Sequence, residues 1–295
     1  MTAIIEAERL SRTYGAVCAV DDVSFAVEEG SVCGLLGRNG AGKTTLLQLV
    51  TGQEFASAGE IRVFGERPLE NAAVLGRTCL VKESQTYPDT FKGGHVLRAA
   101  SWAYADWDEP YARRLVREFG VPLDRRMKKL SRGQRSAIGV IVGLASRAPL
   151  TLFDEPYAGL DAVARQLFYD LLLDDYAKNP RTVVMSTHLI DEASRLLDRV
   201  VVIDSGRVVI DAEAEDLRGS AVSVVGRASQ VDAFVEGRSV LRRDWVGGIA
   251  SATVDGISEA DRAEALAAGL ELAPVSLQEL VVSRTRGDQA QEVSA

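Results

Sequence analysis

A glycine-rich stretch between an apolar run and a helix-forming segment constrains the fold of this chain more than any other feature. The stretch reads GRNGAGKT at 37–44 and has the spacing Gly-x4-Gly-Lys-Thr. The apolar run at 31–36 suits a buried strand, and residues 42–50 suit a helix. A glycine-rich loop of this spacing between a strand and a helix is the P-loop pattern, which cradles phosphate groups. The sequence therefore predicts an α/β fold with a nucleotide phosphate site at the start of that helix.

The residue types in this loop match the chemistry of a triphosphate. Glycine lets the backbone curl so that successive N–H groups point inward at phosphate oxygens. Lys43 would place a positive charge at the β- and γ-phosphates, and the Thr44 hydroxyl would coordinate Mg²⁺. Thr45 would add a donor near the α-phosphate. The predicted nucleotide-binding residues of the loop are Gly37, Arg38, Asn39, Gly40, Ala41, Gly42, Lys43, Thr44 and Thr45.

Two carboxylates follow a second apolar run in the segment PLTLFDEP at 149–156. We expect this run to form a strand directly beside the P-loop strand. Asp154 would then support Mg²⁺, directly or through water, and Glu155 would polarise the attacking water as general base. His188 ends another apolar run. Because ligands bind at the carboxyl ends of parallel strands, we expect His188 to reach the γ-phosphate.

Apolar runs and helical stretches alternate to about residue 211, as expected of an α/β fold with a buried parallel sheet. Beyond that point the chain carries alternating apolar positions, turn glycines and a helix that Ser258 would cap. We expect a nucleotide-binding domain over 1–213, a small α+β appendage over 214–284 and a disordered polar tail over 285–295.

Composition narrows the classes of function. The chain has 295 residues, of which 46% are hydrophobic and 26% charged, and its formal net charge is −8. This acidic balance argues against a broad nucleic-acid-binding surface. No apolar run reaches the roughly 18 residues of a membrane span, and the N-terminus lacks the pattern of a signal peptide. Cys18, Cys33 and Cys79 are expected to be buried apolar residues in a reducing cytosol.

Further segments follow the P-loop in a fixed order: LSRGQ at 130–134, LTLFDEP, AGLD at 158–161 and STH at 186–188. In this order the segments closely resemble the nucleotide-binding subunit of an ATP-binding cassette (ABC) transporter, over roughly residues 3–211. The resemblance implies a P-loop NTPase cassette fold with an N-terminal antiparallel β region and a helical subdomain at about 87–147. It also implies ATP and Mg²⁺ as ligands.

The resemblance further implies a head-to-tail dimer in which each ATP is held between two subunits. Ser131 and Gly133, in the segment that matches the family signature LSGGQ, would contact the γ-phosphate of the ATP bound by the partner subunit, and Gln134 belongs to the same signature. Asp161 would couple the two sites across the interface. Tyr14 matches the aromatic residue that stacks on adenine.

Two positions depart from the family pattern. Arg132 stands where the family has a glycine, but the other signature residues are kept, so function is expected to be retained. Glu83 falls, by spacing, where the family has a glutamine that touches Mg²⁺ and the attacking water. A carboxylate there would ligate Mg²⁺, or repel the γ-phosphate if no metal screens it. A small shift would instead bring Gln85 into this role; the spacing favours Glu83 and leaves the choice open.

The helical subdomain would present the surface that docks a membrane subunit. Its aromatic residues Trp102, Tyr104 and Trp107 would form a docking groove or belong to the core of the subdomain. Exposure of the three rings distinguishes these alternatives.

The leading hypothesis is an ATP-hydrolysing subunit that docks on a separate integral membrane transporter subunit at the cytoplasmic face of the cell membrane. The cassettes would pair as a homodimer or a heterodimer, with no nucleic acid partner. The stretch SQTYPDTF at 84–91 and the small appendage resemble exporter-type bacterial cassettes, which favours export. The alternatives are a soluble non-transport cassette ATPase and a low-turnover regulatory ATP sensor, the latter resting on Glu83 alone.

Overall fold

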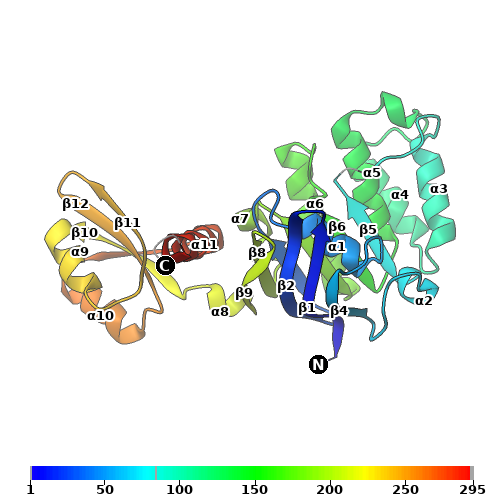
Figure 1. The fold of residues 1–295 in the computed structure, drawn as a ribbon. Helices are drawn as coiled ribbons and strands as arrows, with labels where there is room; N and C mark the ends of the chain where they lie inside the picture. The colour runs from blue at the N-terminus through cyan, green and yellow to red at the C-terminus, as the bar shows by residue number, and fades with distance from the viewer. Residues whose placement is uncertain (1, 84, 293–295) are drawn as a thin grey trace. The chain divides into compact units, whose positions relative to one another are not determined.

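The computed structural model describes residues 2–83 and 85–292, with side chains described up to residue 284. It divides into two compact units, each with its own core (Figure 1). The first unit comprises Met1–His188 and Arg195–Asp211, and the second comprises Leu189–Ser194 and Ala212–Ala295.

A six-stranded sheet lies at the centre of the first unit, with the strand order β5-β6-β7-β3-β8-β9. The four neighbouring pairs from β5 to β8 are parallel. Every residue of β3, β6 and β7 is buried, which confirms the reading of their apolar runs as strands covered on both faces. The strands are β3 Val32–Leu36, β5 Thr78–Lys82, β6 Leu150–Asp154, β7 Thr182–Thr187, β8 Arg199–Asp204 and β9 Arg207–Glu213.

The strand that carries Asp154 does not lie beside the P-loop strand, so this expectation from the sequence is wrong. Strand β7 lies between β6 and β3. An apolar run shows that a strand is buried, but its place in the sheet depends on how the connections cross over. All three strands nevertheless end at one edge, because they are parallel and in register: Asp154 pairs with Ser186, and Leu36 pairs with Thr187.

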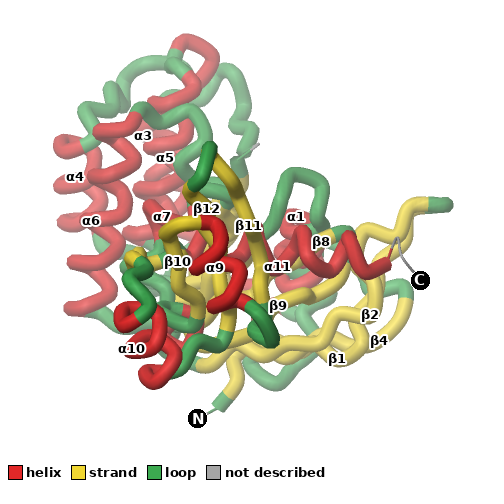
Figure 2. Tube along the Cα trace, turned by 90° about the vertical axis from the view of Figure 1, so that its left-hand side faces the viewer, coloured by secondary structure: helices red, strands yellow, loops and turns green. Residues whose placement is uncertain are grey.

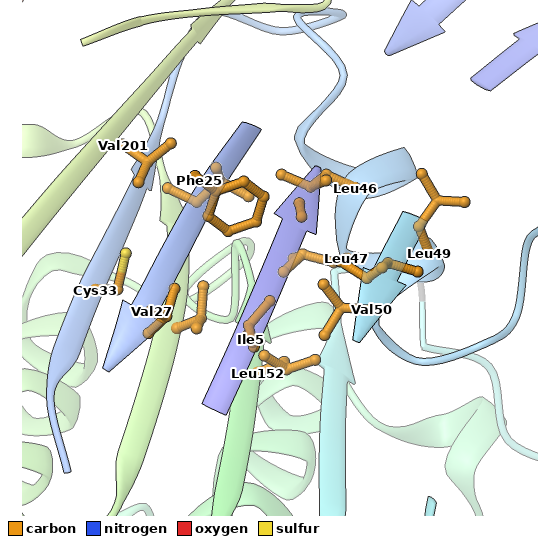
Figure 3. Close-up of a cluster of buried hydrophobic side chains, with 14 of the residues drawn as sticks. Ile5, Phe25, Val27, Cys33, Leu46, Leu47, Leu49, Val50, Leu152 and Val201 are labelled. Carbon is orange, nitrogen blue, oxygen red and sulfur yellow. The ribbon is translucent and has the colours of Figure 1, made fainter. Parts of the chain in front are cut away.

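A three-stranded antiparallel sheet, β2-β1-β4, provides the N-terminal β region that the sequence predicted. Its apolar face shares one core with helix α1 and the central sheet. Figure 3 shows Ile5 of the antiparallel sheet near Leu47 of α1 and Leu152 of the central sheet. This core fixes the start of α1 against the edge where the parallel strands end. The elements are β1 Ala3–Tyr14, β2 Val17–Glu28, β4 Ala58–Val63 and α1 Lys43–Val50.

Helices α3 and α4 each lie beside α5 (Figures 1 and 2). A hydrogen bond from the Tyr111 amide to the Asp108 carboxylate caps α4. The helices of this unit are α2 Ala72–Leu75, α3 Gly93–Ala103, α4 Glu109–Glu118, the 3-10 turn Met127–Lys129, α5 Arg132–Ala145 and α6 Ala162–Lys178.

The three aromatic residues of the helical part differ in how far they are exposed to solvent. Trp102 is 80% exposed, whereas Tyr104 and Trp107 are half-buried. Burial raises the pKa of the Tyr104 phenol, with neighbouring Cys79 adding to the effect. Tyr104 therefore belongs to the interior of the helical part, and Trp102 belongs to its surface.

The second unit follows the order β10-α9-β11-β12-α10-β13, with strands arranged as β11-β12-β10-β13. This is the split βαβ arrangement of an antiparallel sheet with helices on one face. The Ser258 hydroxyl accepts a hydrogen bond from the Asp261 amide, which confirms the predicted helix cap. The elements are β10 Ala221–Arg227, α9 Ala228–Val235, β11 Val240–Val246, β12 Ile249–Asp255, α10 Glu259–Ala267, β13 Glu271–Pro274, and the helices α7 Ile190–Ala193, α8 Ala214–Leu217 and α11 Leu277–Glu292.

Two details of the fold differ from what the sequence led us to expect. Helix α11 runs to Glu292, so helical backbone covers most of the segment expected as a disordered tail, and residues 293–295 lie outside the described part. Residues such as Arg, Gln, Ala and Glu extend a helix readily once its first turns are packed. Cys33 and Cys79 are buried as expected, but Cys18 is exposed, because it lies on an outward-facing position of β2. No helix in the described part of the chain has the length and apolar character to cross a membrane.

Candidate functional site

The P-loop wraps over the carboxyl end of β3 and leads into α1. Gly42, the residue before α1, has a φ of 110°. A Cβ at this position would lie 2.3 Å from the carbonyl oxygen of Ala19, so only glycine fits. The other predicted phosphate-binding residues, from Gly37 to Thr45, lie directly before and after Gly42 in the loop and in the first turn of α1. The start of α1 thus directs backbone N–H groups, and the positive end of the helix dipole, at the space above the loop.

Lys43 is the first residue of α1 and is only 5% exposed. Its Nζ donates to the carbonyl oxygens of Gly37 at 2.7 Å and Arg38 at 3.2 Å. The same atom lies 3.4 Å from Glu155 Oε1. The ammonium group is therefore held over the loop and beside a carboxylate, in the place where a bound phosphate would meet it.

Thr44 and Asp154 meet across the edge of the sheet. Thr44 Oγ1 donates to Asp154 Oδ2 at 2.9 Å, and Ser186 Oγ donates to Asp154 Oδ1 at 2.6 Å. Asp154 is 5% exposed, so these two hydroxyls fix its orientation. Ser186 also accepts a hydrogen bond from the Glu155 amide at 3.1 Å. Our reading of the sequence gave Ser186 no role, although it lies two residues before His188 on the same strand.

The oxygens of Thr44 and Asp154 fit Mg²⁺, which prefers hard oxygen ligands and commonly takes one or two from the protein. No group of three or more His, Cys, Asp or Glu side chains in the described residues forms a complete metal site. A magnesium ion at this edge would therefore depend on phosphate oxygens and water for its remaining ligands, which is the pattern of a nucleotide-bound ion.

Glu155 is held between a cation and an imidazole. Its Oε1 faces Lys43, and its Oε2 lies 3.1 Å from His188 Nδ1. Its backbone φ is 47°, a left-handed conformation that an unconstrained glutamate rarely adopts. Tyr157 buttresses the arrangement, because its hydroxyl accepts from the His188 amide at 3.1 Å and lies 2.8 Å from Thr187 Oγ1. Tyr157 is a second site residue that our sequence reasoning did not identify.

Tyr14 lies at the end of β1 and is 40% exposed. The Arg12 guanidinium stacks 4.5 Å from the centre of its ring and 4.1 Å from the ring of Phe55. Arg12 is itself held by Glu54 at 2.5 Å. Cation–π contact with one guanidinium orients both rings, and enough of Tyr14 stays exposed for stacking on a planar ligand.

The signature residues form the first turn of α5. Ser131 caps the helix: its Oγ accepts from the Gln134 amide at 3.1 Å, and Gln134 Oε1 accepts from the Ser131 amide at 3.1 Å. Gly133 packs against the backbone of Gly159. Asp161 caps α6, with its Oδ1 accepting from the Ala164 amide at 2.8 Å. Within the described residues, no hydrogen bond or ion pair joins this turn to the P-loop, so one chain does not bring the two halves together.

Glu83 and Gln85 follow β5, on either side of Ser84, which lies outside the described residues. Lys82, the last residue of β5, is in register with Asp154. Glu83 forms an ion pair with Arg132 at 2.6 Å and makes no contact with Thr44 or Asp154 among the described interactions. The Gln85 side chain lines a groove of about 450 Å³ together with Arg132 and Arg135. Neither residue reaches the P-loop in this conformation.

A family model described as ABC transporter matches residues 20–158 of the chain. The doxorubicin resistance ATP-binding protein DrrA of Mycobacterium tuberculosis is 30% identical over 75% of this chain and 68% of that protein. The aliphatic sulfonates import ATP-binding protein SsuB 1 of Burkholderia cenocepacia is 32% identical over 86% of this chain and 76% of that protein. A solved ATP-binding subunit of an ABC transporter aligns with a TM-score of 0.63 and 28% identity, over 72% of this chain and 91% of its own.

Proposed function

This chain belongs to the family of ABC transporter ATP-binding proteins, and we propose that it drives export through a separate membrane-spanning partner. As a member of this family it binds and hydrolyses ATP and works with a membrane component. The observation that carries the mechanism is the position of Glu155, whose carboxylate is fixed between Lys43 Nζ at 3.4 Å and His188 Nδ1 at 3.1 Å.

The catalytic step uses groups that are already oriented. Glu155 accepts the proton of the attacking water as general base, and His188 holds the other carboxylate oxygen and faces the γ-phosphate. Lys43 neutralises the β- and γ-phosphates, and the loop N–H groups bind the remaining oxygens. Mg²⁺, when bound by Thr44 and Asp154, would neutralise charge on the triphosphate. Turnover of the purified chain with ATP, compared with Glu155→Gln, tests this assignment and separates a working ATPase from a low-turnover sensor.

The ATP site is completed by a second cassette. In support, Ser131, Gly133 and Gln134 present a capped helix N-terminus at the surface, apart from the P-loop of their own chain. A helix N-terminus binds anions well, and in a head-to-tail dimer this one would meet the γ-phosphate held by the facing subunit. Sedimentation of Glu155→Gln with Mg-ATP tests the idea: dimers are expected, and replacing Ser131 with Arg in the same variant should leave the chain monomeric.

The membrane partner docks on the helical part of the cassette. A cavity of about 280 Å³ lies between α3, α5 and the segment at 85–91, and apolar groups such as Val96, Ala99 and Val142 line it. We expect it to receive apolar side chains of the partner. Ala99→Trp should fill this cavity and abolish co-purification with the partner while basal ATPase activity remains. Arg98→Trp places the same side chain at the neighbouring exposed position of α3 and should leave co-purification intact.

Export is the direction that we propose. The similarity of SQTYPDTF at 84–91 to exporter-type cassettes and the relative named for doxorubicin resistance support it, while the relative named for sulfonate import makes a direct test necessary. In inverted membrane vesicles that contain the chain and its partner, an exporter would accumulate an amphipathic drug such as doxorubicin on ATP addition. ATP-dependent release of preloaded compound would instead indicate import. We place the chain at the cytoplasmic face of the membrane, where ATP is supplied.

A further inference from the structure

The two positions where this chain departs from the family pattern contact each other. Arg132 Nη2 lies 2.6 Å from Glu83 Oε1, although the residues are 49 positions apart. Arg132 is the first residue of α5, directly after Ser131. Glu83 directly follows β5, whose last residue is in register with Asp154. The ion pair therefore connects the signature turn to the edge of the sheet that carries the nucleotide site of the same chain.

The loop before α6 sets the direction of Arg132. A Cβ on Gly159 would lie 2.6 Å from Arg132 Cγ and 3.0 Å from Cδ, and the φ of Gly159 is +90°. A Cβ on Gly133 would lie 2.7 Å from the carbonyl oxygen of Gly159. Ser136 Oγ donates to the carbonyl oxygen of Ala158 at 2.5 Å. The first turn of α5 therefore rests on this loop, and the stem of Arg132 crosses Gly159 toward the end of β5.

The ion pair between Arg132 and Glu83 is exposed to solvent, so it can break easily. The side chains of Arg132 and Glu83 are 64% and 43% exposed. Exposed ion pairs contribute little to stability, because water and salt screen them. An arginine bound to phosphate in a site that excludes water is held more strongly and through two hydrogen bonds. Arg132 is therefore expected to leave Glu83 when a phosphate group comes within reach.

We propose that Arg132 exchanges Glu83 of its own chain for the γ-phosphate of the ATP held by the facing subunit, and that this exchange couples the two ATP sites. The inference rests on the proposed composite site, in which the turn that contains Arg132 faces the partner's ATP. The exchange frees the Glu83 carboxylate beside the end of β6 in its own subunit. Arrival of ATP at one site thus removes the positive partner of Glu83 at the end of β5, the strand in register with the one that carries Asp154, at the other site. Such an effect of one site on the other must be reciprocal.

The test measures dimerisation by sedimentation, with the full-length chain carrying Glu155→Gln as the parent. Glu83→Gln removes the competing partner of Arg132, so the Mg-ATP concentration for half-maximal dimerisation should fall about threefold. Arg132→Gln removes the group that meets the phosphate, so that concentration should rise about tenfold. The double variant should behave as Arg132→Gln alone, because Glu83 acts through Arg132. Lys129→Gln removes an exposed charge from the 3-10 turn just before the signature residues and should match the parent.

Each outcome decides for or against the exchange. A purely structural ion pair predicts that both single variants weaken dimerisation, and independent roles predict that their effects add; either result overturns the proposal. Arg132→Lys keeps the charge and should fall between the parent and Arg132→Gln, which guards against a folding defect in the latter. A parent that stays monomeric contradicts the composite site and this inference with it. A parent that dimerises, with no effect of Glu83→Gln, overturns this inference alone.

Discussion

The two halves of the proposed ATP site differ in how firmly the chain holds them. In the P-loop half, Lys43 and Asp154 are each 5% exposed, and they are contacted by carbonyls of the P-loop, the Glu155 carboxylate, and hydroxyls from α1 and β7. In the signature half, Arg132 is 64% exposed and its ion pair with Glu83 faces water. The half that we propose performs the chemistry is preorganised within one chain, whereas the half that we propose meets a partner is left open.

This difference follows from what each half must do. Preorganised groups stabilise a transition state without having to reorganise during the reaction. A surface that binds and releases a partner in each cycle works better with weak contacts that exchange easily. Substitutions in the first half should therefore affect catalysis and stability, and substitutions in the second half should affect dimerisation.

The largest expected effect is at Glu155. Glu155→Gln removes the general base while keeping the shape of the side chain, so turnover should fall by roughly 1,000-fold. Steady-state ATPase assays measure this loss, and the melting temperature should stay close to that of the parent. A loss of less than about tenfold would assign the base to another residue.

The next largest effect is on the free energy of unfolding, which should differ between a substitution in the P-loop half and one in the signature half. Asp154→Ala leaves the buried hydroxyl of Ser186 without an acceptor for its hydrogen and should lower the free energy of unfolding by about 1–3 kcal/mol. Arg132→Ala removes an exposed ion pair and a side-chain stem that is itself largely exposed, so it should change the free energy of unfolding by less than about 0.5 kcal/mol. Denaturant unfolding of the two full-length variants measures both values. Equal losses would contradict the contrast between the halves.

A glycine substitution probes the loop that supports the signature turn. Gly159→Ala strains a φ of +90° and also collides with the stem of Arg132. Gly120→Ala provides a matched control, because Gly120 has a φ of +61° and a Cβ added there would have no heavy atom within 4 Å. Both should destabilise the fold by about 1 kcal/mol, but only Gly159→Ala should weaken ATP-dependent dimerisation in sedimentation. Equal dimerisation of the two variants would remove this loop from the interface.

The smallest expected effect is on the melting temperature at alkaline pH, and it comes from Tyr87 in the helical part. Burial raises the pKa of the Tyr87 phenol to about 12, with Cys79 adding to the shift. A raised pKa of the folded state means that this contribution to stability is complete below the usual tyrosine pKa of about 10 and is lost as pH rises through about 12. Between about pH 10 and about pH 12, the melting temperature of the parent should therefore fall by a few degrees more than that of Tyr87→Phe. Parallel curves for the two proteins would contradict this burial effect.

The sequence predicted the elements that depend on local patterns. The apolar runs, the P-loop and the Ser258 cap each rest on a spacing that lies within a few residues, and each appears in the structure. The position of β7 between β6 and β3 was missed, because strand order is decided by crossover connections and not by the pattern within a strand.

Contacts between distant segments could not be derived from the sequence. Ser186 and Tyr157 support Asp154 and His188 only because separate strands end at one edge. Arg132 and Glu83 were each recognised as unusual, but their contact depends on the packing of α5 against the loop at 158–159. The sequence did contain one indication of this contact. Arg132 and Glu83 both differ from the family pattern and carry opposite charges, which suggests that they form a compensating pair.

The central claim is that each ATP site is shared between two chains, and mixing two inactive variants tests it most directly. Lys43→Ala disables the P-loop but leaves the signature, and Ser131→Arg disables the signature but leaves the P-loop. A mixed dimer has one intact shared site, whereas a dimer of either variant with itself has none, so the ATPase activity of an equal mixture should rise well above that of each separate protein. A mixture that stays as inactive as the two separate proteins would contradict the account.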